Sequence, residues 1–288
     1  MTNYPGFGGL LAALSDRKSL DVGALARRAG ALEAELEGVL AGVMPSPLLL
    51  RRLGPALGLH AVDVCVIAGA TIPDDLAPLD ADARKWVPRA VGHAAGLPQE
   101  ERGELLEFVR SLGPYDCVQS PPVPQDYDPP VGPPGALLVR MLRYRNLDRM
   151  GMARIFAHLT GRYWSASTYG MVGSGRKALT ADLVHDFGTV LGIAPDDLAA
   201  LTGTTLSVEL RGPEPAAVDM AELIWDLRRL TADQVRRVGE VAASMQRTCA
   251  DVGAAVPPLF TATRAVGACS RGPGHPAIRR TGCYPPAG

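Results

Sequence analysis

Side chains that commonly carry catalysis or bind metals are spread thinly through this 288-residue chain. The five histidines are scattered and include no HExxH motif, and the five cysteines include no CxxC pair of the kind that binds zinc. We therefore expect free thiols in a reducing compartment, and we predict no catalytic site, no metal site and no cofactor. The histidines are His60, His93, His158, His185 and His275, and the cysteines are Cys65, Cys117, Cys249, Cys269 and Cys283.

One segment superficially resembles a phosphate-binding loop. Gly170–Thr180 reads GMVGSGRKALT, which combines glycines with two cations. It lacks a glycine placed four residues before a Gly-Lys-Ser/Thr triplet, and no buried strand precedes it. We therefore do not expect nucleotide binding there, and the surrounding elements must decide what these residues do.

Composition indicates a folded protein without a strong overall charge. Hydrophobic residues make up 47% of the chain and charged residues 20%, which is enough for one large domain or two ordinary ones. The net charge of −1 gives no broad attraction to nucleic acid or to anionic lipid, so any such attraction must be local. The first residues do not show the basic region followed by an apolar segment that is typical of a signal peptide. No apolar run approaches the roughly 18 residues of a membrane span. We expect a soluble, cytoplasmic protein that does not bind membranes.

The remaining sequence is mostly helical in pattern, and strand-like alternation is scarce. Residues 113–136 contain eight prolines, which predicts an interdomain linker. Residues 250–288 are rich in proline, glycine and arginine and have no acidic residue after Asp251, which predicts a disordered, weakly basic tail. The predicted class is all-α.

Two halves of the chain repeat each other. LDVGALAR at Leu20–Arg27 matches LDRMGMAR at Leu147–Arg154, and LPQEERGELLEFV from Leu97 matches LTADQVRRVGEVA from Leu230. The repeat predicts two compact helical units, each followed by a helical hairpin. The expected units are residues 8–71 and 137–203, and the expected hairpins are residues 80–112 and 218–249.

Each compact unit resembles the lambda-repressor-like helix-turn-helix of the XRE family of bacterial regulators. In the first unit, Val22–Ala29 corresponds to helix two, Gly30 and Ala31 to the turn, and Glu33–Ala41 to the recognition helix. Leu36 and Val39 take the core positions of that helix. The resemblance implies a tandem pair of such units within the all-α fold.

The second unit fits the same pattern with a longer connection. Its recognition helix is Ser165–Gly175, with Ser165 as N-cap, Gly175 as the C-terminal stop, and Tyr169 and Val172 as core positions. Met152 to Ser165 is 13 steps, whereas Leu25 to Leu32 is 7. We therefore expect six extra residues in the turn.

The resemblance implies that a recognition helix lies in the major groove while flanking residues hold phosphates. In the first unit, Glu33, Glu35 and Glu37 would oppose the phosphates, so we expect a structural or partner-binding role there. In the second unit, eight basic residues against five acidic ones give a net charge of +3 over residues 137–203. The DNA contacts implied for this unit are Arg162, Ser165, Ala166, Ser167, Met171, Ser174, Arg176 and Lys177.

We therefore expect a DNA-binding transcriptional regulator whose partner is double-stranded DNA, held mainly by the second unit. Regulators of this family usually bind as dimers, and here the two copies form either a pseudo-dimer within the chain or part of a homodimer. We expect the two hairpins to pack together within one chain or between two. The alternative is an adaptor that has lost DNA binding and uses the acidic first unit to contact a basic protein.

Overall fold

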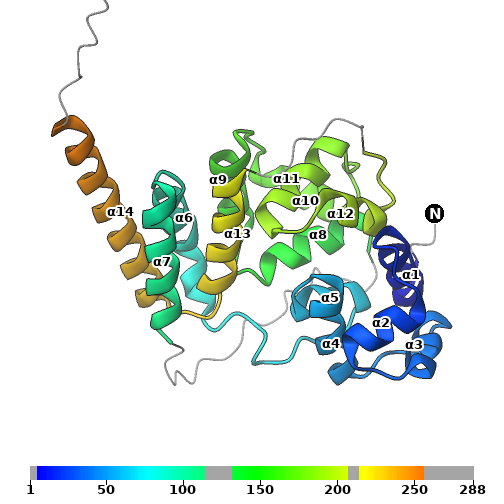
Figure 1. Ribbon diagram of the computed structural model, residues 1–288. Coiled ribbons are helices and arrows are strands. Elements are labelled where there is room, and N and C mark those ends of the chain that lie inside the picture. The colour runs from blue at the N-terminus through cyan, green and yellow to red at the C-terminus, as the bar shows by residue number, and fades with distance from the viewer. Residues whose placement is uncertain (1–4, 114–131, 207–213, 256–288) are drawn as a thin grey trace, which may run out of the picture.

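The computed structural model describes residues 5–113, 132–206 and 214–255 (Figure 1). Within these ranges the backbone forms fourteen α-helices and one short 3-10 helix, and it forms no β-strand. The all-α class predicted from the sequence is confirmed. In the same ranges, no helix is both long and apolar enough to cross a membrane.

Helices α1 to α5 form the first unit, which we define as residues 7–68. Local side chains set several helix ends: Asp21 accepts a hydrogen bond from the Ala24 amide and caps α2, and Gly30 ends α2 with a φ of 59°. The observed α2 therefore has the bounds expected from the sequence. The five helices are α1 Phe7–Arg17, α2 Val22–Ala29, α3 Glu33–Leu40, α4 Pro47–Leu57 and α5 Ala61–Ala68.

Helices α8 to α12 form the second unit, residues 134–202, and their ends are set in the same way. Asp148 accepts from the Gly151 amide to cap α9, and Thr180 accepts from the Leu183 amide to cap α11. The helices are α8 Pro134–Arg143, α9 Arg149–Thr160, α10 Ala166–Gly173, α11 Ala181–Leu191 and α12 Pro195–Thr202.

The helices of the two units have matching neighbours. In the first unit α1 packs on α3, α2 packs on α3 and α4, and α4 packs on α5. In the second unit α8 packs on α10, α9 packs on α10 and α11, and α11 packs on α12. A methyl group added at Gly8 would collide with the carbonyl oxygen of Val39, and one added at Gly135 would collide with that of Val172. The two units are therefore structural repeats of each other.

The remaining helices form two hairpins that pack together as a four-helix bundle (Figure 1). The first hairpin packs against the second through α6 on α14 and α7 on α13. Arg102 of α7 and Asp219 of α13 form a salt bridge of 2.7 Å across this contact. The hairpins therefore pair within one chain, which the sequence left open. Their elements are η1 Ala81–Lys85, α6 Val87–Ala95, α7 Gln99–Ser111, α13 Pro215–Leu227 and α14 Ala232–Ala255.

The bundle lies against the second unit, where α6 packs on α9 and α13 packs on α11 (Figure 1). The first unit lies on the other side of the second unit from α14 in this view. The second unit therefore contacts both the first unit and the bundle, and the first unit also contacts the bundle directly, where the His60 ring stacks on the Trp225 ring of α13.

The expectation that six extra residues sit in the turn of the second unit is wrong. Four of them lengthen the helix, because α9 has 12 residues and α2 has 8. The other two lie in the connection, which has five residues (161–165) against three (30–32). The added helical turn consists of residues 157–160, and the partly buried Leu159 in this turn packs against the core, which stabilises it as helix.

Two further boundaries differ from those expected. α8 begins at Pro134, so the last three residues of the expected linker are helical, and proline is tolerated in a first helical turn. α14 continues to Ala255, six residues beyond the expected end of the hairpin. The rest of the expected linker and tail, residues 114–131 and 256–288, lie outside the described residues.

Candidate functional site

α10 presents one apolar face to the core and one uncharged face toward solvent. Tyr169 and Val172 are buried as expected, and the Tyr169 ring packs edge-on against Phe156 with centroids 5.1 Å apart. The expected core positions of α3, Leu36 and Val39, are buried as well. The outward residues of α10 are Ala166, Ser167, Gly170 and Met171, and none of them is charged.

The hydroxyls expected to contact DNA are held by local hydrogen bonds. Ser165 occupies the N-cap position, but its Oγ pairs with the hydroxyls of Ser167 and Thr168 instead of a backbone amide. At the other end of α10, Ser174 Oγ donates to the carbonyl of Met171 and accepts from Arg176 Nε at 3.1 Å. Ser165, Ser167, Ser174 and Arg176 are exposed, so these hydroxyls and this guanidinium remain accessible from solvent.

Lys177 is positioned by an aromatic ring. Its Nζ lies 4.7 Å from the centroid of the Trp164 ring, within the range of a cation–π contact. The Trp164 indole donates through Nε1 to Asp186 Oδ2 at 2.9 Å. Lys177 is therefore held next to the connection between α9 and α10.

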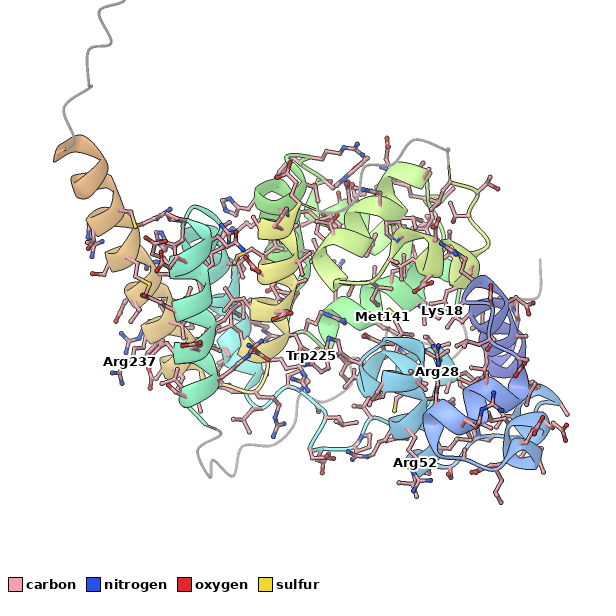
Figure 2. All side chains as sticks on the ribbon, in the orientation of Figure 1. Lys18, Arg28, Arg52, Met141, Trp225 and Arg237 are labelled. Carbon is pink, nitrogen blue, oxygen red and sulfur yellow. The ribbon has the colours of Figure 1, made fainter. Side chains whose placement is uncertain are left out.

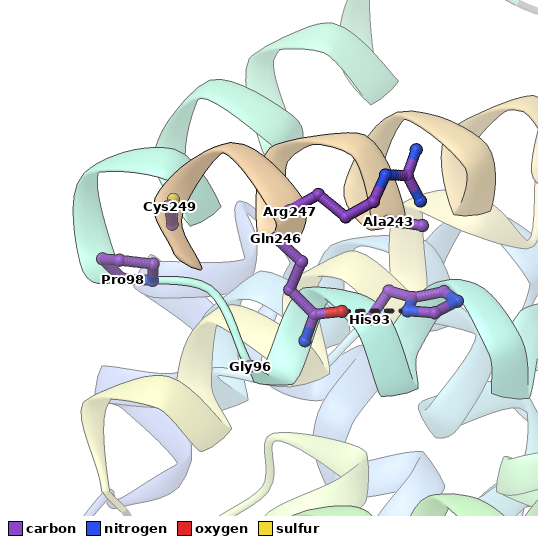
Figure 3. A pocket seen from close by; sticks show the side chains of 7 residues that line it. All are labelled: His93, Gly96, Pro98, Ala243, Gln246, Arg247 and Cys249. Carbon is purple, nitrogen blue, oxygen red and sulfur yellow. Dashed lines mark hydrogen bonds between the residues drawn. The ribbon is translucent and has the colours of Figure 1, made fainter. Parts of the chain in front are cut away.

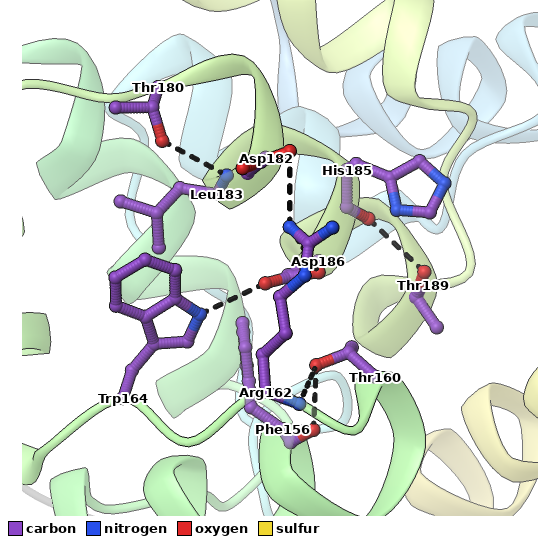
Figure 4. A network of polar contacts seen from close by, with 10 residues as sticks. All are labelled: Phe156, Thr160, Arg162, Trp164, Thr180, Asp182, Leu183, His185, Asp186 and Thr189. Atoms are coloured by element: carbon purple, nitrogen blue, oxygen red, sulfur yellow. Dashed lines mark hydrogen bonds and ion pairs between the residues drawn. The ribbon is translucent and has the colours of Figure 1, made fainter. Parts of the chain in front are cut away.

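Arg162 lies at the N-terminal side of α10 in a network with two carboxylates (Figure 4). Its Nη1 is 3.1 Å from Asp182 Oδ1 and 3.7 Å from Asp186 Oδ1. Asp186 is buried, and burial raises the pKa of its carboxyl group, while the hydrogen bond from Trp164 and the charge of Arg162 act in the opposite direction. These contacts fasten the long α9–α10 connection to α11 and pair Arg162 with two carboxylates of that helix.

Sequence reasoning missed Arg149 as a neighbour of α10. A methyl group added at Gly170 would lie 3.1 Å from Arg149 Nη1, so this guanidinium lies across the outer face of α10 where a glycine leaves room. Arg149 begins α9 and is exposed. Arg149 and Gly170 are 21 positions apart in the chain, and nothing in the local sequence indicates this contact, which depends on how α9 and α10 cross.

The equivalent surface of the first unit has the opposite character. Glu33, Glu35 and Glu37 are all exposed on α3. Alignment of the two units on Val39 and Val172 places Val43 and Met44 where the second unit has Arg176 and Lys177. Arg52 occupies the position of Asp186 and donates to the Gly30 carbonyl at 2.9 Å, so residues of opposite charge hold the two connections.

The two units contact each other through two equivalent pairs of helices. α1 of the first unit packs on α12 of the second, and α5 of the first packs on α8 of the second. Lys18 Nζ lies 2.5 Å from Asp197 Oδ2, and Arg145 Nη1 lies 2.7 Å from Asp63 Oδ1. Lys18 and Arg145 both stand two residues before the Leu-Asp that opens each repeat, so the same ion pair forms twice in opposite directions. Reciprocal contacts of this kind characterise an approximate two-fold interface.

The Arg145 copy of this ion pair is fully buried. Arg145 and Asp63 are both 0% exposed, and Arg145 also donates to the carbonyls of Met141 and Leu191. In the Lys18 copy, the lysine side chain is 24% exposed and the aspartate 8%. Lys18 and Met141 lie where the first unit meets the second (Figure 2).

An aromatic stack ties the first unit to the second hairpin. The His60 ring lies parallel to the Trp225 ring with centroids 3.5 Å apart, and the Arg228 guanidinium lies 3.4 Å from the Trp225 centroid. Burial lowers the pKa of His60 to about 4, and the nearby charges of Arg145 and Arg228 act in the same direction. His60 is therefore neutral at physiological pH.

A shallow depression of about 650 Å³ lies between α6 and α14 (Figure 3). His93 Nδ1 pairs with Gln246 Oε1 at 3.0 Å. Cys249 Sγ is 3.4 Å from Glu101 Oε1, and desolvation together with this carboxylate raises the pKa of the thiol. A protonated thiol is a poor nucleophile, so Cys249 is not activated here. The lining residues are His93, Gly96, Pro98, Ala243, Gln246, Arg247 and Cys249.

The described part of the chain contains no cluster of three or more His, Cys, Asp or Glu side chains arranged to hold a metal ion. No family model, curated protein or solved structure matches the sequence or the fold. The surface around α10 is the strongest candidate site because it combines an uncharged helix face with four nearby cations.

Proposed function

We propose that the protein is a transcriptional regulator of the XRE helix-turn-helix type that binds double-stranded DNA through α10 of the second unit. The observation that carries this proposal is the surface of α10, where mostly small, uncharged side chains are flanked by three cations and a fourth, Arg149, lies across the outer face. Small side chains allow a helix backbone to approach the floor of a groove closely, and the cations stand where phosphates would pass. The four cations are Arg149, Arg162, Arg176 and Lys177.

Phosphate contacts supply most of the affinity in this proposal. Arg176 and Lys177 follow α10, Arg162 precedes it, and Arg149 lies across its outer face. Ala166, Ser167 and Met171 offer few hydrogen bonds to base edges, so sequence discrimination through direct contacts is weak. Four phosphate contacts predict that affinity falls about 100-fold between 50 and 200 mM salt.

The existing ion pairs of Arg162 do not prevent phosphate binding. Arg162 and Asp182 are 46% and 63% exposed, and an exposed pair of this kind contributes at most about 1 kcal/mol. A phosphate can therefore replace Asp182 at little cost. Asp186 remains as the buried partner that aims the Arg162 side chain along the α9–α10 connection.

The approximate two-fold junction supports a single-chain version of the usual dimer. In a dimer of this family, two copies of the unit place two recognition helices on one duplex. Here the reciprocal contacts of α1 with α12 and of α5 with α8 join two units within one chain. Because α3 carries three exposed carboxylates, the proposal assigns the first unit a small share of the DNA affinity.

The test is fluorescence anisotropy with labelled random duplex DNA at low and moderate salt. We expect salt-sensitive binding that weakens at least about tenfold when Arg162, Arg176 and Lys177 are all changed to alanine. The matched control changes three exposed arginines of the hairpins, Arg89, Arg237 and Arg247, to alanine and removes the same charge. Equal loss in both variants, or no binding of the wild type at low salt, contradicts the proposal.

The second candidate function is an adaptor that binds no DNA. The acidic and apolar surface around α3 favours it, because neither feature suits a polyanion. Absence of DNA binding at low salt would leave the adaptor as the better proposal.

A further inference from the structure

Exposed apolar side chains gather at both ends of α3. Among the described residues, seven large hydrophobic side chains are classed as exposed, and four of them flank this helix. Leu32 directly precedes α3 and is 76% exposed. Val43 and Met44 closely follow α3 and are 63% and 66% exposed, and Leu48, in the first turn of α4, is 57% exposed. Clusters of exposed apolar side chains on a soluble protein mark contact sites for partners.

The charges between these apolar residues are all negative. Glu33, Glu35 and Glu37 are exposed and lie on the helix that separates Leu32 from Val43. α3 carries no lysine or arginine. We define the α3 surface as these three carboxylates together with the four apolar side chains, Leu32, Val43, Met44 and Leu48.

The α3 surface differs in composition from the equivalent surface of the second unit. The position of Leu32 is occupied by Ser165, that of Glu33 by Ala166, and that of Glu37 by Gly170. The positions of Val43 and Met44 are occupied by Arg176 and Lys177. The two repeats therefore share a backbone arrangement, but each has an outer face of different chemistry at the same positions.

We propose that the α3 surface binds a protein segment in which lysine or arginine side chains are interleaved with apolar ones. Apolar side chains of the partner would cover Leu32, Val43 and Met44, whose exposure to water is unfavourable. The partner's cations would pair with the carboxylates, which repel nucleic acid and acidic segments. An amphipathic basic helix satisfies both requirements, because it carries its cations beside an apolar stripe. The proposal goes beyond DNA binding and does not depend on it.

The first experiment measures binding of a fluorescent synthetic peptide with lysine and leucine at helical spacing to the full chain. A peptide of the same length with glutamate in place of lysine is the ligand control. We expect the lysine peptide to bind, and we expect Glu33→Gln, Glu35→Gln and Glu37→Gln combined to weaken it about tenfold. The matched protein control is Glu100→Gln, Glu104→Gln and Glu107→Gln, which removes the same charge from exposed positions of α7.

The apolar part of the surface needs its own variant. Leu32→Ser combined with Met44→Ser keeps every charge, and we expect it to weaken the lysine peptide about fivefold or more. Both side chains are largely exposed, so these variants should keep the wild-type thermal midpoint. DNA affinity, measured in the same preparations, should not fall in any of these variants, which separates this proposal from that of the second unit.

Three outcomes would overturn the proposal. The first is equal affinity for the lysine and glutamate peptides, and the second is equal weakening by the α3 and α7 glutamine variants. The third is self-association of the wild-type protein at low salt that the α3 variants abolish, because the occupant would then be the cationic surface of a second copy.

Discussion

His60 is a largely buried histidine whose lowered pKa links the stability of the protein to pH. It stacks on Trp225 and is surrounded by the charges of Asp63, Arg145 and Arg228. Burial lowers the pKa of His60 to about 4, from an ordinary value of 6.5. The neutral ring thus fits the junction between the first unit and the second hairpin, and the protonated ring does not.

We expect His60 to make the protein less stable in mild acid. Between pH 6.5 and about 4 the unfolded chain binds a proton at His60 that the folded chain does not, so the free energy of unfolding falls as the pH falls. The contribution is about 2 kcal/mol across this range. His60→Phe keeps a flat ring on Trp225 but cannot titrate, so its urea-unfolding free energy should fall less over the same pH range. Identical pH profiles for the two proteins would rule out this role.

α8 and α10 can approach each other closely because residue 135, at their contact, is a glycine. A side chain at this position would meet the Val172 carbonyl and side chain, and Gly8 fills the same role between α1 and α3. Backbone atoms cannot move aside as a flexible side chain can. The packing of α10, and so the position of its outer face, follows from this glycine.

Gly135→Ala should therefore lower the free energy of unfolding by about 2 kcal/mol or more, because the added methyl group overlaps backbone atoms. The control is Gly103→Ala in α7, where no atom lies within 4 Å of the added methyl group. The control should raise stability by about 0.5 to 1 kcal/mol through helix propensity. Urea denaturation measures both. Equal effects of the two substitutions would show that α8 has room to shift away from α10.

Sequence reasoning located the elements whose ends are set locally. The bounds of α2 follow from Asp21 and Gly30, and the four core positions implied by the resemblance, Leu36, Val39, Tyr169 and Val172, are buried. The extent of α9 was missed, because nothing local distinguishes a longer helix from a longer turn. Ser19 and Asn146 adopt positive φ values of 53° and 60° at equivalent positions of the two repeats, a detail that only the backbone reveals.

The candidate site was predictable in composition but not in its contacts. Arg162, Arg176 and Lys177 could be identified by their position around α10, whereas the partners of Arg162 and Lys177 depend on where α11 and the α9–α10 connection pack. The same holds for the junction, where Lys18 and Asp197 are 179 residues apart in the chain. Long-range partners of this kind leave no trace in local spacing.

At the scale of the whole molecule, the two ion pairs of the junction differ in burial and so in energy. Arg145→Met leaves Asp63 buried without its partner and should cost about 3 to 5 kcal/mol. Lys18→Met at the equivalent, partly exposed position should cost about 1 to 2 kcal/mol. Combining Arg145→Met with Asp63→Leu should recover most of the loss, because no charge remains buried. Urea denaturation measures these differences, and equal costs of Arg145→Met and Lys18→Met would contradict them.

The concentration dependence of the unfolding midpoint tests whether the junction and the bundle form within one chain. Because the two-fold junction and the bundle both form within one chain, the midpoint should not depend on protein concentration. A midpoint that rises with concentration would mean that pairing between chains contributes to stability.

Joining two repeats in one polypeptide removes a constraint that identical subunits impose. In a homodimer each substitution appears in both subunits. A carboxylate that favours a ligand at one site is therefore also present at the equivalent site of the other subunit. Here Val43 and Met44 can change without any change at Arg176 and Lys177, while Asp63 and Asp197 keep the junction in place. A single chain can therefore carry surfaces of opposite charge at equivalent positions of its two repeats.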